Sequence, residues 1–287
     1  METPKRTLES LRKTPHWSFS SLNTFLNHCS LKWAFGHVYN AECESTDASL
    51  PFGLAFHSAA SLFAISKQNG NTISEKETQD AFSEWLKLEF SNAKNLRLDE
   101  GDTFDALNEL GHRMLQILLG KLGGSDQILA VSKAYKVPIL DASGEAVSEL
   151  SLIGETDLEV LEGNEHVIVD WKTAARKWPA DKAGKDLQPT CLLYMKSQTE
   201  SEKGKWLFRF DVVTKAKTPV LESHYTIRGR DDYKRLAHLV MAVERAVKAE
   251  AFYPNESSFL CGSCSYACAC KAWHRKSNKI TLNLAAA

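Results

Sequence analysis

The central stretch of the chain, Gly154–Thr173, reads GETDLEVLEGNEHVIVDWKT. Two runs of alternating polar and apolar residues flank Gly163-Asn164, a pair typical of two-residue hairpin turns. If these two residues form the loop, Glu162 lies opposite Glu165. The stretch therefore predicts a tight antiparallel hairpin at the centre of the chain.

The same register places two carboxylates, Asp157 and Asp170, directly opposite each other. Like charges on neighbouring strands repel unless a proton or a cation lies between them. Oxygen ligands of this kind suit Mg²⁺ or Mn²⁺, and Lys172 would bring an ammonium group beside the metal to orient water or stabilise phosphate charge. A solvated edge hairpin gives the same pattern, and a one-residue register slip would break the pairing. Spacing alone leaves both readings open.

Alternation along the strands also predicts which face is buried. The face that carries the carboxylates should include Glu155 and Lys172. The opposite face is expected to be core, and its residues are Leu158, Val160, Val167, Val169 and Trp171.

The remaining pattern predicts helices around a small sheet. Helices are expected at 17–35, 51–67, 75–96, 103–122, 187–198 and 231–252. Further strands are expected at 128–140, 150–161, 205–215 and 219–227. The fold class is therefore expected to be α/β, a small mixed β-sheet flanked by helices in one domain over 1–287, with a helical insertion at about 70–125.

Composition narrows the class of protein. The 287 residues are 43% hydrophobic and 25% charged, which is typical of a soluble globular chain. We expect no membrane span and a cytoplasmic location, because we find no uninterrupted apolar run of spanning length and no signal-peptide pattern.

A net charge of −1 gives no global attraction to nucleic acid, so DNA contact needs a local patch. The basic stretch 172–185, with Trp178 available to stack on a base, is the candidate, and a solvated loop is the alternative.

The seven cysteines are unevenly distributed. Cys29, Cys43 and Cys191 stand alone, whereas the other four lie within residues 261–270. In a reducing compartment such crowding favours metal ligation over disulfides.

Three motifs together resemble the PD-(D/E)XK nuclease superfamily, specifically its RecB-type branch. They are Gly154-x-x-Asp157, Ile168-Val169-Asp170-Trp171-Lys172-Thr173, and Gly53-x-x-x-His57 within Phe52–His57. The resemblance spans about 18–273 and implies a restriction-endonuclease-like core. It implies that His57, Asp157, Asp170 and the main-chain carbonyl of Trp171 ligate the catalytic metal, and that Lys172 assists the attacking water.

The family usually has a Gln on the next helix, followed four residues later by a Tyr. Here Gln188 fits the first position, but Leu192 occupies the second, and Tyr194 lies six residues on. Positions i and i+6 do not share a helix face. Gln188 is therefore a candidate catalytic residue that contacts DNA or metal-bound water, and Tyr194 is expected in the core.

The C-terminal pattern Cys261-x2-Cys264-x5-Cys270 resembles the iron-sulfur signature of the same branch, whose fourth ligand comes from the N-terminal region. Cys29 fits that ligand, so the resemblance implies a 4Fe-4S cluster that joins the two ends of the chain. Four thiolates also suit Zn²⁺. Cys268 could replace Cys270, since a Cys264-x3-Cys268 spacing is sterically possible.

The resemblance implies a metal-dependent DNA nuclease. We expect an exonuclease on single-stranded or frayed DNA, in CRISPR spacer acquisition or in DNA repair and recombination, with an integrase complex or a repair helicase as partner. The chain has no P-loop and so lacks a helicase half. The competing hypotheses are a non-catalytic DNA-binding or assembly subunit that retains the iron-sulfur fold, and a zinc-stabilised enzyme of unrelated chemistry.

Overall fold

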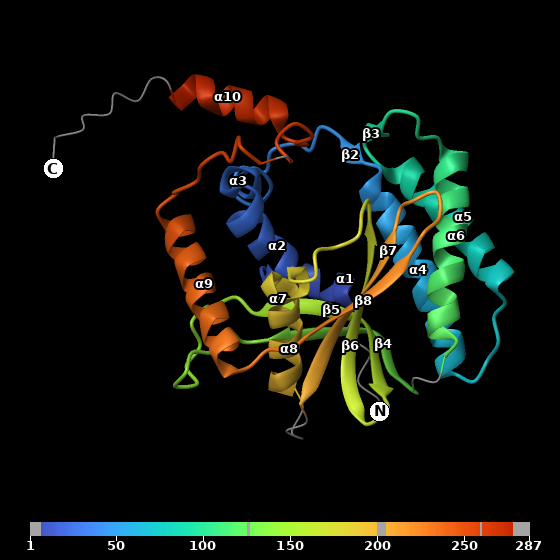
Figure 1. Ribbon diagram of the computed structural model, residues 1–287. Coiled ribbons are helices and arrows are strands. Elements are labelled where there is room, and N and C mark those ends of the chain that lie inside the picture. The colour runs from blue at the N-terminus through green and yellow to red at the C-terminus, as the bar shows by residue number, and fades with distance from the viewer. Residues whose placement is uncertain (1–6, 125–126, 200–204, 259, 278–287) are drawn as a thin grey trace, which may run out of the picture.

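The computed structural model describes residues 7–124, 127–199, 205–258 and 260–277 (Figure 1). A mixed β-sheet crosses the molecule, and helices cover both of its faces. Its strands are β1 (Trp17–Ser18), β4 (Gln127–Val137), β5 (Leu152–Glu162), β6 (Glu165–Ala174), β7 (Trp206–Thr214) and β8 (Leu221–Thr226). A small second sheet pairs β2 (Thr46–Asp47) with β3 (Leu96–Arg97).

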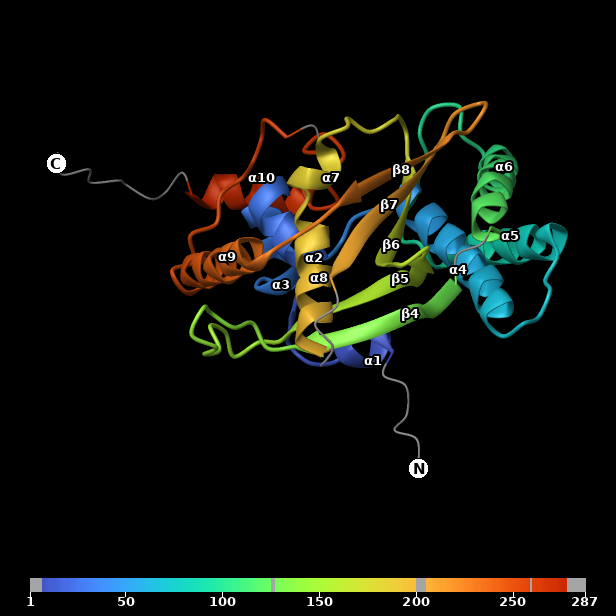
Figure 2. The same ribbon diagram turned by 60° about the horizontal axis from the view of Figure 1, so that its bottom comes forward.

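The helices fall into two groups and a few short pieces. The first group packs on one face of the sheet and contains α4 (Ser49–Gln68), α5 (Glu75–Asn92) and α6 (Phe104–Leu122). The second packs on the other face and contains α2 (Phe19–Asn23), α3 (Ser30–His37), α8 (Leu187–Thr199) and α9 (Arg230–Lys248). The others are α1 (Leu8–Arg12), a π-helical turn (Thr24–His28), α7 (Lys182–Lys185) and α10 (Ala267–Ser277). Figure 2 shows the first group on one side of β5 and β6 and α8 on the other. The expected α/β class is confirmed.

The predicted hairpin register is confirmed from the turn to the Leu158–Val169 pair, but the expected direct pairing of Asp157 with Asp170 is wrong, because the ladder ends before those residues. Glu162 pairs with Glu165 and Leu158 pairs with Val169 in the antiparallel ladder between β5 and β6. Gly163 has φ 61°, a left-handed conformation that glycine adopts without a steric penalty. The turn chemistry read from the sequence therefore fixes the pairing of the two central strands.

Both faces of the sheet are buried. Leu158, Val160, Val167, Val169 and Trp171 all belong to the core under α4, α5 and α6, as the alternation predicts. The opposite face carries Ile168, Phe208 and Phe210 under α8 and α9. Removal of this apolar surface from water on both sides stabilises the sheet.

Strand β5 changes neighbours along its length. One of its edges pairs with β4 from Gln127 to Val137. The other edge pairs with β1 at Leu152 and Ile153, and with β6 only from Leu158 onward. Residues 154–157 of β5 therefore have neither of these partners on that edge. This open segment is the place where side chains from other elements can reach the strand.

The single helix expected at 17–35 is wrong. The segment forms β1, α2, the π-helical turn and α3 in succession. Ser18 caps α2 because its hydroxyl accepts the N–H of Ser21 at 3.2 Å. Cys29 has extended backbone and caps α3, since its Sγ accepts the N–H of Lys32 at 3.3 Å. The cysteine thus lies at a break between helices and not inside one.

Helix α4 is long and apolar enough to cross a membrane, judged by length and composition within the described part of the chain. Its inward-facing residues, among them Ala55, Phe56, Ala59 and Ala60, are fully buried in the protein core. This burial is what a central core helix requires.

Candidate active site

Strands β5 and β6 diverge immediately beyond the hairpin. The ladder ends at the Leu158–Val169 pair, one step before Asp157 and Asp170. The N–H of Trp171 donates instead to Oδ2 of Asp157 at 2.8 Å. The Asp157 carboxylate thus takes the place of a main-chain carbonyl as the acceptor for this N–H of β6. Asp157 is therefore held at the point where the two strands separate.

Helix α4 brings His57 to this carboxylate. Nδ1 of His57 lies 3.1 Å from Oδ1 of Asp157. Burial lowers the pKa of His57, but attraction to Asp157 more than offsets it, so the pKa is raised above its ordinary value. Burial raises the pKa of Asp157, and attraction to His57 outweighs it, so that pKa is lowered. The pair therefore favours an imidazolium and a carboxylate in hydrogen-bonding contact.

Asp170 is the most buried carboxylate of the group. Its side chain is 5% exposed, and Nζ of Lys172 lies 2.5 Å from its Oδ2. Burial raises the pKa of Asp170 to about 6 in spite of the attraction to Lys172. For Lys172, burial lowers the pKa, but Asp170 and then Asp157 reverse the effect and raise it. Asp170 is thus a carboxylate kept out of water, whose charged form a cation would stabilise.

Gln188 reaches Asp170 from the first turn of α8. Its Nε2 donates to Oδ1 of Asp170, and its Oε1 is buried with no hydrogen-bond partner in the described part of the chain. Its backbone N–H donates to Oδ1 of Asp186 at 2.8 Å. The sequence-predicted residues His57, Asp157, Asp170, Lys172 and Gln188 are therefore brought together from α4, β5, β6 and α8.

Tyr194 lies in the core, as expected. It is 3% exposed, and its hydroxyl donates to the carbonyl of Pro138 at 3.0 Å and accepts the N–H of Leu140 at 2.8 Å. Leu192, at the position where the family usually has Tyr, is also buried. The hydroxyl joins α8 to the loop after β4 and has no contact with the carboxylates.

Sequence reasoning did not identify Arg228. Its guanidinium donates to Thr190 Oγ1 at 2.9 Å and to the carbonyls of Ala183, Gly184 and Asp186 at 2.9 to 3.1 Å. These groups frame α7 and the start of α8, where Gln188 lies. No spacing signal connects residue 228 to residue 188, because the contact arises from tertiary packing.

The site offers donors that suit a hard divalent cation. Two carboxylates, an imidazole and the unpaired amide oxygen of Gln188 converge, and oxygen-rich sets of this kind favour Mg²⁺ or Mn²⁺. Within the described residues no three His, Cys, Asp or Glu side chains are grouped closely enough to hold one ion, either here or among the cysteines. Here the acids contact His57, Lys172 and Gln188. The donor atoms are of the types that Mg²⁺ or Mn²⁺ binds. In this structure the side chains that carry them contact one another.

The basic stretch 172–185 is partly neutralised. Lys177 pairs with Glu222 at 2.6 Å, and Lys185 forms an ion pair with Asp181. The Trp178 ring packs edge-on against Phe210, and Lys182 lies 3.9 Å from its centroid. Trp178 is half-buried by these contacts, and its stacking on a nucleobase stays a prediction.

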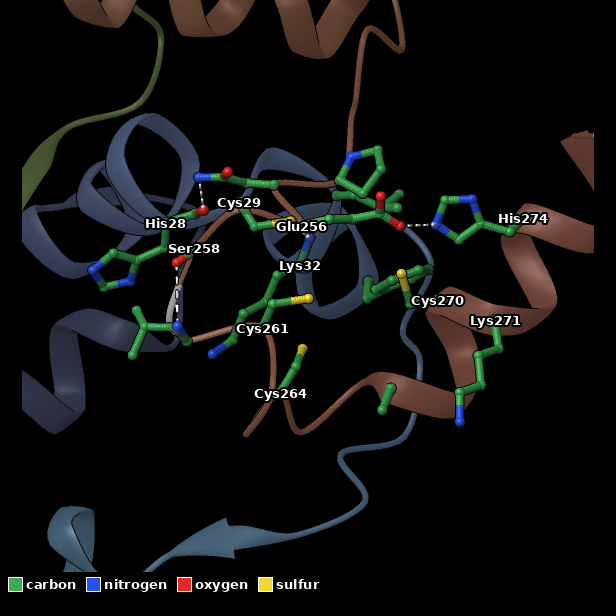
Figure 3. Close-up of a pocket in the computed structure, with 16 residues that line it drawn as sticks. His28, Cys29, Lys32, Glu256, Ser258, Cys261, Cys264, Cys270, Lys271 and His274 are labelled. Atoms are coloured by element: carbon green, nitrogen blue, oxygen red, sulfur yellow. Dashed lines mark hydrogen bonds and ion pairs between the residues drawn. The ribbon is translucent and has the colours of Figure 1, made fainter.

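Four cysteines surround one cavity between the N- and C-terminal regions (Figure 3). Cys29, Cys261, Cys264 and Cys270 line a space of about 240 Å³, together with Lys32 and Lys271. Cys268 does not line this cavity. It is exposed, and its backbone N–H donates to Oε1 of Glu44 at 2.7 Å. Burial, followed by the nearby Cys264, Cys29 and Cys261, raises the pKa of Cys270.

Hydrogen bonds bring the two ends of the chain together around this cavity. Ser30 Oγ accepts the N–H of Tyr253 at 2.9 Å and donates to the carbonyl of the same residue at 3.1 Å. The amide of Asn255 donates to the carbonyl of His28 at 2.9 Å. Cys29 is thereby fixed beside the segment that leads to the C-terminal cysteines.

Comparisons with known proteins agree with this architecture. Residues 16–271 match the PD-(D/E)XK nuclease superfamily. Among solved structures, a Eubacterium rectale protein described as a candidate exonuclease has 15% sequence identity and a TM-score of 0.51, with 92% of this chain and 93% of that chain covered. SSO0001 has 10% identity and a TM-score of 0.38, with coverage of 74% and 94%. The search of curated proteins finds no match.

The family match covers most of the chain, and the Eubacterium rectale structure shares its fold. The chain belongs to the PD-(D/E)XK nuclease superfamily.

Proposed function

We propose that this protein is a Mg²⁺- or Mn²⁺-dependent DNA nuclease whose catalytic residues are His57, Asp157, Asp170, Lys172 and Gln188. The observation that carries the proposal is the convergence of these five side chains where β5 and β6 separate. A buried carboxylate with a raised pKa beside a lysine is unusual in a purely structural site and common in a catalytic one.

His57, Asp157, Asp170 and the main-chain carbonyl of Trp171 would hold the cation. When bound, Mg²⁺ or Mn²⁺ lowers the pKa of coordinated water and offsets phosphate charge. Lys172, already adjacent to Asp170, keeps an ammonium where an attacking water must be oriented and where charge develops. Gln188 holds Asp170 through its amide nitrogen, and its buried, unpartnered amide oxygen would be available to the cation or to water bound to it.

The substrate that fits this proposal is a single-stranded or frayed DNA end, cut as an exonuclease cuts. Membership of the nuclease superfamily supports phosphodiester hydrolysis. The proposed roles are CRISPR spacer acquisition or DNA repair and recombination in the cytoplasm, with an integrase complex or a repair helicase as partner.

Asp170→Ala tests the active site. Cleavage of end-labelled single strands by the wild type should require Mn²⁺ or Mg²⁺ and stop in EDTA, and the variant should lose it by at least about a hundredfold. Asp231→Ala, an exposed carboxylate on α9, is the matched control and should cleave normally. Metal-independent cleavage, or full activity in Asp170→Ala, would overturn the assignment. A wild type that binds DNA without cutting it would favour the non-catalytic subunit.

We also propose that Cys29, Cys261, Cys264 and Cys270 hold a 4Fe-4S cluster. The four thiols line one cavity, as a cluster ligated by four cysteines requires. A zinc site would need all four sulfurs about 2.3 Å from one ion. Lys32 and Lys271 line the same cavity and would balance the negative charge of four thiolates. Three clustered cysteines and one remote cysteine are the arrangement that the resemblance implies for a cluster, and a Zn²⁺ site is the alternative.

A further inference from the structure

A second cavity lies against the N-terminal segment, apart from the cysteines and from the carboxylates. This groove, called here the N-terminal groove, has a volume of about 730 Å³, within the range of ligand sites. It is lined by residues 12–18 and by residues from α2, the π-helical turn, α3, the loop before β5 and α9. The latter residues are Ser20, Ser21, Thr24, Trp33, His37, Leu150 and Val247.

The lining of the groove is suited to an anionic ligand. Arg12, Lys13, His16 and His37 all line it. No Asp or Glu side chain belongs to this lining, although the chain as a whole has slightly more acids than bases. Hydroxyl groups of serine and threonine residues supply further donors. Glu244 lies on the adjoining surface, where it accepts the indole N–H of Trp17 at 3.0 Å and is already engaged.

The groove also has an aromatic base that is rigidly held. The rings of Trp17 and Trp33 stack with centroids 5.9 Å apart, and His37 stacks on Trp33 at 4.7 Å with an interplanar angle of 4°. Ser21 accepts the indole N–H of Trp33 at 2.8 Å, which fixes the middle ring. The two tryptophans are buried, whereas His37 is exposed, so His37 ends the stack with a planar surface that a nucleobase can cover.

The sheet connects this groove to the carboxylates. Strand β1, which lines the groove, pairs with Leu152 and Ile153 of β5. Asp157 follows Ile153 on the same strand by about 13 Å at the usual rise per residue. The intervening residues of β5 pair with neither β1 nor β6; helix α1 packs against this strand, and its residues Leu8 and Arg12 both act on Glu155. The groove and the carboxylates are therefore separated by a short length of β5, a distance that a few nucleotides of single-stranded DNA can span.

We infer that the N-terminal groove binds the single-stranded segment of the substrate next to the phosphate that is cut. Arg12, Lys13 and His16 contact phosphates, and His37 stacks with one base. This inference rests on the proposed nuclease function and adds a substrate-binding site to it. Because phosphate contact and stacking read no base edges, binding is expected to be independent of sequence.

The test compares Arg12→Ala/Lys13→Ala and His37→Ala with the wild-type full-length protein. A short fluorescein-labelled oligothymidylate in EDTA reports affinity by anisotropy over a salt series, and cleavage in Mn²⁺ gives kcat and KM. The double variant should bind on the order of tenfold more weakly and lower the salt slope by about 1.4, since each lost phosphate contact on a single strand removes about 0.7. Its KM should rise while kcat at saturating DNA is unchanged, and His37→Ala should weaken binding without changing the slope.

The matched control is Lys76→Ala/Lys87→Ala, which removes two exposed charges from α5, away from the groove. It should bind as the wild type does. Equal loss of affinity in the control would show that charge acts without a defined site and would overturn the inference. The inference would also be overturned if the wild type cleaves DNA and both groove variants bind the oligothymidylate as tightly as the wild type does. A wild type that neither binds nor cleaves DNA would instead remove the proposed nuclease function.

Discussion

Asp170 carries an electrostatic cost in the metal-free protein. Its side chain is 5% exposed, and its pKa is raised from 3.8 to about 6, chiefly by burial. Between these two values the folded state holds a proton that the unfolded state releases. Stability of the metal-free protein therefore falls as pH rises through this window and stays lower above it.

Asp170→Asn should remove this cost. We expect the variant in EDTA at pH 7.5 to have a higher Tm than the wild type, by about 2 to 4 °C for each kcal/mol gained. The raised pKa of Asp170 already reflects both its burial and its attraction to Lys172, so the loss of this ion pair in the variant needs no separate correction. The difference in Tm between variant and wild type should narrow as the pH is lowered below the unfolded-state pKa of 3.8, because Asp170 is then mostly protonated in both the folded and the unfolded state. Thermal unfolding at both pH values measures this, and a variant less stable than the wild type at pH 7.5 would contradict it.

Tyr194 illustrates how a residue near a family motif can be structural. Its hydroxyl serves two main-chain groups, the carbonyl of Pro138 and the N–H of Leu140. Tyr194→Phe leaves both without this partner, which should cost about 1 to 3 kcal/mol of unfolding free energy. Urea unfolding measures the loss, and kcat should match the wild type. A large fall in kcat with unchanged stability would instead place the phenol in catalysis.

At the scale of elements, the start of α8 depends on Arg228. The guanidinium bonds three carbonyls of 183–186 and the hydroxyl of Thr190, so it fixes the backbone on both sides of Gln188. Arg228→Ala should lower kcat by roughly tenfold to a hundredfold with little change in KM, because small displacements of a catalytic group are costly.

Two further variants separate positioning from charge. Arg228→Lys keeps the charge but not the planar set of donors, so it should recover only part of the activity. Arg235→Ala removes an exposed arginine of α9 and should be neutral. Full recovery by Arg228→Lys would show that only charge matters and would refute the positioning role.

The central hairpin could be predicted because its determinants are local. Gly163-Asn164 sets the turn, alternation sets the faces, and the observed register is the predicted one. The divergence of β5 and β6 could not be predicted from spacing, since it depends on the bond from Trp171 to Asp157. The helix break at Cys29 and the contacts of Arg228 with residues 183–190 could not be predicted for a similar reason. Each depends on a contact between segments that are distant in sequence or on a π-helical turn that periodicity does not reveal.

At the scale of the whole molecule, the two ends of the chain share one structure. Ser30 and Asn255 provide hydrogen bonds across the junction between residues 28–31 and 253–255. Helix α10 lies beside α3 in Figure 1. These polar contacts are few and partly exposed, so they are a weak closure for a loop of this length. A cluster ligated from both ends would add its binding free energy directly to folding.

Cys261→Ser tests whether the cysteines close the molecule. If a 4Fe-4S cluster is held as proposed, the purified wild type is brown, and the variant should lose both the visible absorbance and thermal stability. Each kcal/mol of lost stability would lower Tm by about 2 to 4 °C, and we expect a loss of a few kcal/mol. Cys268→Ser is the matched control, because Cys268 lies only a few residues away but does not line the cavity. It should keep both properties. Loss of colour with unchanged Tm would leave the cluster without a structural role, and equal effects of the two substitutions would place the ligands elsewhere.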